Sequence, residues 1–150
     1  MNAIDILKKD HQDVQQLFSE FMSADDEDFG RREDLFQHID TALIAHSDAE
    51  EQIFYPAIEN YAPDLVKQAL NEHQEVKQLL AEMLDIEVDD EEFDTRMMSL
   101  IEKVQGHVQE EEGPGGVFEI ARQNLDQAEL DEMGRRIEQR KRDSQEELAA

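Results

Sequence analysis

The 150-residue sequence contains no cysteine, and basic side chains are scarce. Without cysteine, disulfide bonds, thiolate catalysis, iron–sulfur clusters and zinc sites built on thiolates are all excluded. Only 14 Lys and Arg stand against 39 Asp and Glu, which gives a formal net charge of −25. Because phosphate binding needs clustered basic side chains, we predict no nucleic-acid partner and no anionic membrane surface. Basic partners and metal cations remain open.

Long apolar runs are also missing. No run approaches the roughly 20 residues that span a bilayer, and the first residues lack the basic flank and apolar stretch of a signal peptide. We therefore expect a cytoplasmic protein that has no membrane partner. The chain has only three prolines and six glycines, which leaves room for long helices, and its length suits one domain with a substantial core.

Apolar residues recur at steps of three and four along most of the chain, which is the period of an amphipathic helix. The pattern predicts four helices, at about 3–22, 31–60, 64–86 and 91–112. The breaks between them are short, so we predict an all-α, up-down-up-down four-helix bundle. Pro63 suits the first turn of the third helix, and Asp89 or Asp90 suits the N-cap of the fourth.

The segment Gly113-Pro114-Gly115-Gly116 interrupts the fourth helix, since proline removes a helical donor and clashes with the preceding turn. We predict a C-terminal helical extension at about 114–142. It can restart at Asp126, whose D-x-x-E spacing to Glu129 is that of a capping box. We expect the polar tail, 143–150, to be frayed. The chain is thus one domain, 1–150, with its helical core at about 3–112.

An internal repeat links the two halves of this core. Residues 10–20 align with residues 72–82, and the alignment matches His-Gln, Gln-Leu and the flanking acids as well as the apolar positions. His11 and His46 are 35 residues apart, and His73 and His107 are 34 apart. The bundle is therefore predicted to consist of two helical hairpins related by an approximate twofold.

Six polar residues fall on the otherwise apolar inner stripes of the four helices. They are His11, His46, Glu50, His73, His107 and Glu111. Burying them is costly unless something pairs them. Each glutamate follows a histidine by four residues, one helical turn or ~6 Å, so each pair can face one point.

Four imidazoles and two carboxylates suit iron, manganese or zinc better than calcium or magnesium. Two ions, each held by two histidines and both bridged by the two glutamates, would use the whole set. We pair His11 with His46 and His73 with His107. Other pairings respect the twofold equally.

These residues resemble the hemerythrin-like family, also called the HHE cation-binding domain. The resemblance spans about residues 3–112. It is carried by Asp10-His11, His46-x-x-x-Glu50-Glu51 followed by Phe54-Tyr55-Pro56, Glu72-His73, and His107-x-x-x-Glu111-Glu112. It implies a four-helix bundle with a non-haem di-iron centre, bridged by Glu50 and Glu111, with manganese or zinc as substitutes. The ligand implied is dioxygen, nitric oxide or peroxide.

Two features depart from the oxygen-carrying hemerythrins. Those proteins have a second histidine one turn after the third-helix histidine, where this sequence has Lys77. The Gly113–Gly116 break follows Glu111 at a point where relatives usually continue a helix. Both argue against reversible oxygen carriage, and both would open coordination positions for redox chemistry.

Neighbouring polar residues are given structural roles. Glu51, Glu110 and Glu112 point about 100° away from the ligands, so we expect solvated faces. The remaining three residues are expected to be exposed (His38), packed in the core (Tyr55) and paired at the surface or snorkelling (Lys77).

The ferritin-type di-iron class is disfavoured, because no histidine has a glutamate three residues before it. Three other functions stay open. The first alternative is a sensor, store or carrier that binds a small diatomic ligand. The second is a di-iron oxidoreductase that removes peroxide or nitric oxide, and the third is an iron-handling or metal-stabilised protein. No residue is assigned a catalytic role. The ligand pocket is expected to be dry and lined by Leu43, Ile53, Leu70, Leu100 and Val104.

Overall fold

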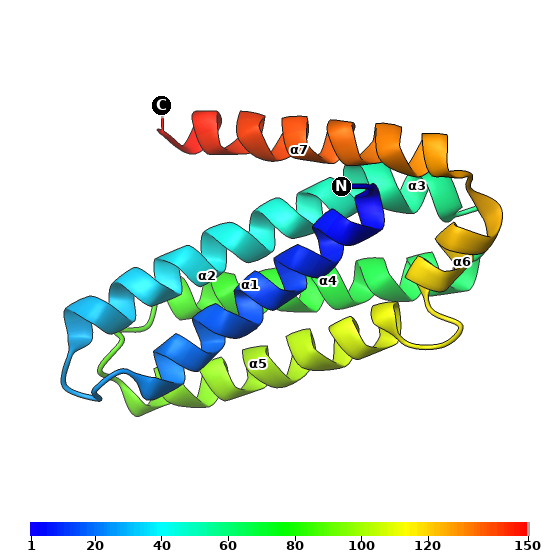
Figure 1. The fold of residues 1–150 in the computed structure, drawn as a ribbon. Helices are drawn as coiled ribbons and strands as arrows, with labels where there is room; N and C mark the ends of the chain where they lie inside the picture. Colours follow the sequence, from blue (N-terminus) through cyan, green and yellow to red (C-terminus); the bar gives the residue numbers. More distant parts are fainter. Residues whose placement is uncertain (150) are drawn as a thin grey trace.

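Four long helices form the bundle that the apolar period predicts (Figure 1). They are α1 (Ala3–Ser23), α2 (Phe29–Ala49), α4 (Pro63–Leu84) and α5 (Glu91–Glu112). Each packs against the next along the chain, and α5 packs back on α1, which closes the bundle. This computed structural model describes residues 1–149, and side chains through residue 147. Within that range the fold is all-α, and the predicted fold class is confirmed.

The helices begin where the sequence offers a cap. The side chain of Asn2 accepts from the backbone of Asp5 in a reciprocal capping box, and Asp28 and Asp90 cap α2 and α5. Pro63 occupies the first turn of α4. The predictions for Pro63 and Asp90 are therefore confirmed.

The second predicted helix, 31–60, is not one regular α-helix. After α2 the chain forms a five-residue π-helix, Glu50–Phe54, and then α3, Tyr55–Ile58. The N–H of Tyr55 donates to the carbonyl of Glu50, five residues back. Pro56 gives the physical reason, because it has no N–H with which to continue the regular ladder. The helix therefore continues through the π-helical segment, but the side chains that follow it face a different side than they would on a regular α-helix.

The predicted interruption at Gly113–Gly116 is a tight turn. Gly115 has φ +76°, a left-handed conformation that favours glycine. A Cβ on Gly116 would lie 2.2 Å from the carbonyl oxygen of Glu110, so the turn can close only on glycine there. The chain then forms α6, Val117–Asn124, which packs against α5 and α3.

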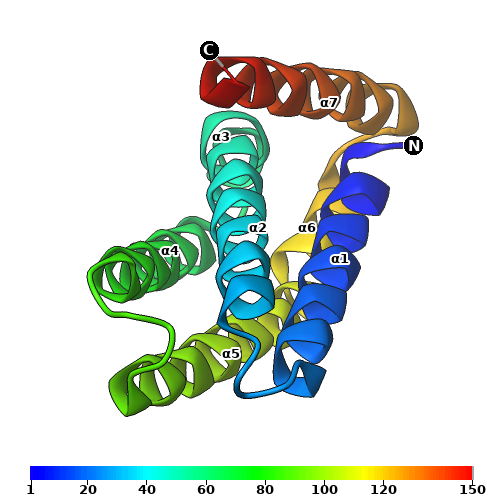
Figure 2. The same ribbon diagram turned by 90° about the vertical axis from the view of Figure 1, so that its left-hand side faces the viewer.

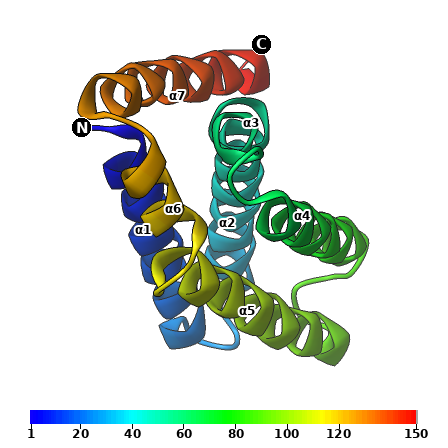
Figure 3. The same cartoon turned by 90° about the vertical axis from the view of Figure 1, so that its right-hand side faces the viewer.

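The C-terminal helix, α7, runs from Gln127 to Ala149 and crosses the outer side of the α1–α2 hairpin (Figures 2 and 3). The side chain of Asp126 accepts from the backbone of Glu129, which confirms the predicted restart. The expected fraying at 143–150 is wrong as far as Ala149. Buried Leu130, Met133 and Ile137 anchor α7 on the bundle, and the helix then propagates through residue pairs one turn apart.

Two apolar clusters fill the bundle, one on each side of a buried polar layer. Around one end of the bundle, the largest fully buried side chains are Ile4, Leu7, Phe54, Tyr55, Ile58 and Phe118. Around the other end they are Leu35, Ile39, Leu80, Met83, Phe93 and Met97. No helix among the described residues is long and apolar enough to cross a membrane.

Candidate metal centre

The polar layer contains all six predicted site residues. One histidine comes from each bundle helix: His11 from α1, His46 from α2, His73 from α4 and His107 from α5. Glu50 opens the π-helix and Glu111 lies in the last turn of α5. All six are buried, and Glu50 is 0% exposed. They form two groups whose donor atoms lie within 4.8 Å of one another. One group is His11, His46, Glu50 and Glu111, and the other is Glu50, His73 and His107.

The histidines are arranged in two similar pairs. The rings of His11 and His46 have centroids 4.8 Å apart, and those of His73 and His107 are 4.9 Å apart. Both pairs have an interplanar angle of 63°. This arrangement agrees with the pairing that the repeat suggested.

Both carboxylates lie between the two pairs. Glu50 Oε1 is 2.9 Å from the Nε2 of His46 and 3.1 Å from the Nε2 of His73. Glu111 Oε1 is 3.3 Å from the Nε2 of His11 and also 3.3 Å from that of His107. Each glutamate therefore contacts one histidine of each pair, which is the placement expected of a bridging carboxylate.

A second ring of acids fixes the orientation of the imidazoles. The Nδ1 atoms of His46 and His107 contact Asp10 at 2.9 Å and Glu72 at 2.7 Å. Those of His11 and His73 contact Glu112 at 2.7 Å and Glu51 at 2.9 Å. A neutral imidazole that donates its Nδ1–H to such a carboxylate presents the lone pair of Nε2 to the centre of the bundle.

This outer ring was largely missed by the sequence reasoning. Glu51 and Glu112 were assigned to solvated faces. Glu112 is exposed, as predicted, and Glu51 is half-buried, but each also accepts a hydrogen bond from a site histidine. Asp10 and Glu72 were noticed only as parts of the repeat. The signal was present in that repeat, because an acid precedes His11 and His73 and an acid follows Glu50 and Glu111. Glu110 and His38 are exposed, as predicted.

Five of the inward-facing atoms lack hydrogen-bond partners among the described residues. These buried atoms are His11 Nε2, His46 Nε2, His107 Nε2, Glu50 Oε2 and Glu111 Oε1. Buried polar atoms are almost always paired, and leaving five unpaired in one place is costly. Imidazole nitrogens and carboxylate oxygens are metal donors. The donor set therefore fits a centre that holds cations.

The buried carboxylates of the polar layer also favour positive charge at its centre. Burial disfavours the imidazolium of His46, but the adjacent Glu50 carboxylate outweighs this and raises the pKa of His46 to about 10. His107 is likewise opposed by burial, and Glu111 raises its pKa to about 12. Burial acts to raise the pKa of Glu50, yet the three nearby histidines hold it well below its usual range. Protons on the imidazoles thus supply the charge that a metal cation would supply.

Tyr55 joins the site, which corrects its assignment to packing alone. Its buried hydroxyl donates to Glu111 Oε2 at 2.5 Å and lies 3.2 Å from His73 Nε2. On a regular α-helix it would lie half a turn from the face of His46. The intervening π-helix reduces the rotation per residue and brings the ring inward. Lys77 forms an ion pair with Glu51 at 2.9 Å, so the predicted surface pairing is confirmed.

The glycine turn covers one side of the centre. It brings α6 back over the bundle, so that Phe118 stacks on the His11 ring with centroids 5.7 Å apart and an interplanar angle of 19°. Phe118 also packs edge-on against Phe54. We had expected the turn to open coordination positions, but on the His11 side it closes the site against water.

A small apolar cavity adjoins the four histidines on the opposite side. It is lined by Val14, Leu43, Val76 and Val104 as well as by the imidazoles. Its volume is about 30 Å³, which accommodates a diatomic molecule but no organic substrate. Leu43 and Val104, two of the residues predicted to line a ligand pocket, line this cavity. Ile53 and Leu100 are buried without lining this cavity, and Leu70 is 40% exposed because α4 turns Ala69 inward instead.

With the geometry established, similarity to known proteins identifies the family. The model of the hemerythrin HHE cation-binding domain matches residues 2–114. The chain belongs to the hemerythrin HHE cation-binding domain family. The resemblance drawn from the sequence is thereby confirmed, and the family identifies this HHE domain as a cation-binding protein.

Two curated proteins are similar in sequence. A DNA nickase from Nostoc sp. (strain PCC 7120) is 32% identical over 126 residues, which cover 83% of this chain and 35% of the nickase. An uncharacterized hemerythrin-like protein from Schizosaccharomyces pombe is 30% identical over 112 residues, covering 72% of this chain and 54% of that protein. The HHE domain thus spans about a third and about half of these two relatives.

One solved structure is similar in fold. It is the crystal structure of an HHE cation-binding domain-containing protein from Mycobacterium kansasii, with a TM-score of 0.80 and 23% sequence identity. The match covers 96% of this chain and 87% of the other. It therefore includes most of the helices beyond the matched family domain, and it shows that the fold as a whole is that of a known HHE protein.

Proposed function

We propose that this HHE domain binds two iron ions and presents them to a small ligand, either a diatomic molecule or peroxide. His11 and His46 would hold one ion, His73 and His107 the other, and Glu50 and Glu111 would bridge them. The observation that carries the proposal is the set of five buried donor atoms that lack any hydrogen-bond partner. Two cations between the imidazole pairs would satisfy all five.

Iron suits the donor set, and when bound it would supply reversible one-electron chemistry. The protein's own contribution is orientation and exclusion of water. Four carboxylates hold the Nδ1 protons and so increase the basicity of the four Nε2 atoms. Phe118 and the valines around the cavity keep the site dry. The volume of the cavity limits the ligand to two or three heavy atoms.

One observation favours an oxidoreductase over a reversible binder. The Tyr55 hydroxyl is a buried proton donor 2.5 Å from Glu111 and next to His73. Reduction of peroxide or nitric oxide consumes protons, whereas reversible ligand binding does not need a protein donor. A phenol oxygen at this place can also complete the donor set of the His73 pair, which has three donors where the His11 pair has four.

The nickase resemblance does not lead us to propose DNA binding. The shared region is only about a third of that protein. The net charge of −25 opposes a phosphate backbone. The absence of a nucleic-acid partner thus stays a prediction, and retention on a DNA-coated column at physiological salt would disprove it.

The proposed function is tested by metal analysis and by reaction of the reduced protein. We expect about two iron ions per chain after loading. Rapid oxidation with turnover of peroxide or nitric oxide supports the oxidoreductase, and a persistent reversible adduct supports a binding protein. Unreactive iron would leave an iron-handling or metal-stabilised protein. A chain that retains no iron contradicts the proposal. In Tyr55→Phe, unchanged turnover and an unchanged visible spectrum would remove the tyrosine from the mechanism.

A further inference from the structure

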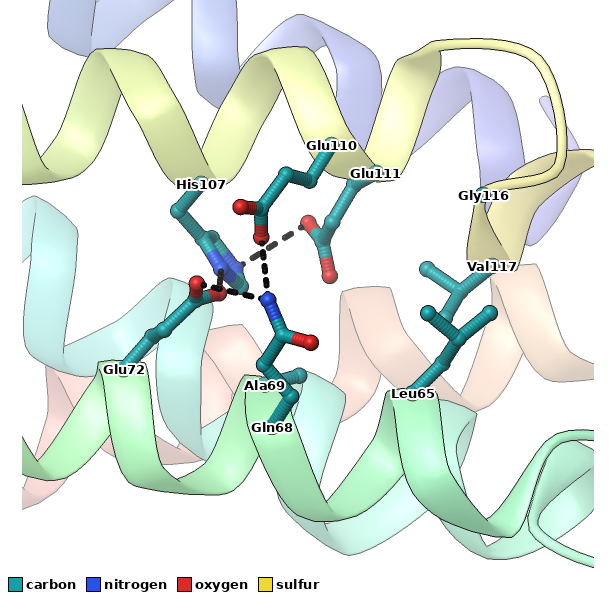
Figure 4. A pocket seen from close by; sticks show the side chains of 9 residues that line it. All are labelled: Leu65, Gln68, Ala69, Glu72, His107, Glu110, Glu111, Gly116 and Val117. Carbon is teal, nitrogen blue, oxygen red and sulfur yellow. Dashed lines mark hydrogen bonds and ion pairs between the residues drawn. The ribbon is translucent and has the colours of Figure 1, made fainter.

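A small pocket lies between α4 and α5 beside the proposed metal centre, and both apolar and polar side chains line it (Figure 4). Its outer part is formed by Gln68 and Glu72 on α4 and by Glu110 on α5. His107 and Glu111 lie at its inner end, where Glu111 Oε1 is buried without a hydrogen-bond partner. The pocket therefore places the exposed carboxylate of Glu110 and the half-buried carboxylate of Glu72 beside two of the proposed ligands.

The polar groups of this pocket form one chain of contacts. Gln68 Nε2 donates to Glu110 Oε2 at 3.1 Å and to Glu72 Oε2 at 3.3 Å. The other oxygen of Glu72 contacts His107 Nδ1 at 2.7 Å. Glu72, His107 and Glu110 have donor atoms within 4.8 Å of one another. Of the three such donor groups in the described part of the chain, this one alone includes an exposed residue.

In the other hairpin, the described residues at the positions related by the repeat do not present the same polar groups. The mate of Gln68 is Ile6, which is buried, and the mate of Glu110 is Ala49, which is 0% exposed. The mate of Gly116 is Tyr55, a buried aromatic residue. The approximate twofold therefore holds for the ligands but fails along this path.

Two other acids of the outer ring are blocked by cations. Lys77 pairs with Glu51, and Lys141 pairs with Asp10. A lysine at either point repels an approaching metal ion. At Glu72 the neighbours are instead a neutral amide and a second carboxylate.

We propose that Glu110, Gln68 and Glu72 form the route by which a divalent cation enters and leaves the metal centre. The inference rests on the proposed function, because it requires a resident metal. Glu110 and Glu72 receive the ion from solvent, and the ion passes to His107 and Glu111 at the inner end of the pocket. The route adds no ligand to the final site, so it acts on rates and leaves the final metal content unchanged.

The test compares the rates of metal transfer in two charge-matched variants of the full chain. Glu110→Gln removes the outer carboxylate of the route. Glu102→Gln is the control, since Glu102 is an exposed acid on the same helix, two turns from Glu110. Uptake is followed by the visible absorption of Co²⁺ added to metal-free protein. Release is followed by transfer of Fe²⁺ from loaded protein to a chromogenic chelator without oxygen.

We expect Glu110→Gln to slow uptake and release by the same factor, about tenfold, because carboxylates at the mouth of a cleft concentrate cations there. Its metal content at equilibrium should equal that of the unaltered chain, and Glu102→Gln should behave like that chain. Gln68→Leu should also slow both rates. Unaltered rates in Glu110→Gln, or equal slowing in Glu102→Gln, would overturn the route. Failure of the unaltered chain to bind metal would instead overturn the proposed function.

Discussion

The two hairpins of the bundle present the same ligands to the centre but have different surroundings. Each contributes two histidines, a glutamate and two orienting acids. The α1–α2 hairpin is covered by α7 and by Phe118 of α6. The α4–α5 hairpin instead carries the small pocket that Gln68, Glu72 and Glu110 help to line.

The repeat therefore determines the donor atoms. The elements outside the repeat, which are the π-helix, the glycine turn, α6 and α7, determine access to the proposed metal centre and its reactivity. After Glu50 the chain forms a π-helix that turns Tyr55 inward. After Glu111, at the related point, the chain forms a tight glycine turn that leads into α6. The two proposed metal positions are therefore related in their ligands and unequal in their chemistry.

The largest effect is expected where the hairpins share a ligand. Glu50→Gln keeps the volume of the side chain but removes its charge, and Glu50 contacts histidines of both pairs. We expect both ions to be lost and the melting temperature to fall to that of the metal-free protein. Elemental analysis and thermal denaturation measure this, with Glu102→Gln as the charge-matched control. Retention of both ions would show that Glu50 does not bridge the halves.

Single-hairpin variants should remove one ion each. His73→Ala deletes a ligand of the second pair only, and His11→Ala deletes one of the first. We expect the iron content to fall from about two to about one per chain in each variant. Loss of both ions in either variant would mean that the two positions cannot be filled independently.

The orienting acids should have intermediate effects. Asp10→Asn and Glu72→Gln leave the ligands in place but weaken the hold on His46 and His107. Substitutions of this kind typically reduce metal affinity by about 10- to 100-fold. Competition with a chelator measures the change. Equal affinity in the unaltered and substituted proteins would show that these contacts do not tune the site.

The smallest effect is expected from α7. Lys141 lies outside the matched family domain and forms an ion pair with Asp10, which in turn holds His46. Lys141→Met should change the affinity at the first hairpin by no more than about threefold, as expected for a partly exposed ion pair. Arg142→Met is the matched control, because Arg142 donates a hydrogen bond to Gln139 within α7. Identical metal affinities in the two variants would show that α7 does not influence the metal centre.

Most of the fold could be predicted from the sequence, because the signals were local. The helical period, Pro63 and Asp90 placed the bundle helices within a few residues. The π-helix was not foreseen, since a single proline shortly after Glu50 gives no sign of which hydrogen-bond pattern will absorb it. The helical tail depends on docking against α1 and α2, which is a tertiary effect.

The six proposed ligands could be found from spacing because each interrupts an apolar stripe. Tyr55 could not, since its orientation depends on the π-helix. Leu70 was predicted to face the core, but the buried side of α4 passes through Ala69 instead. Because alanine is small, it contributes little to the apolar periodicity from which the buried side was predicted. The outer acids lie next to ligands in sequence, where a rotation of 100° suggests solvent, yet long side chains reach back to the neighbouring helix.

The most direct measurement is an anomalous difference map at the iron edge, from a crystal of the iron-loaded protein. Two peaks are predicted, one between His11 and His46 and one between His73 and His107, with Glu50 and Glu111 contacting both. A single peak, or no peak with the imidazoles bound to water, would contradict a two-metal centre.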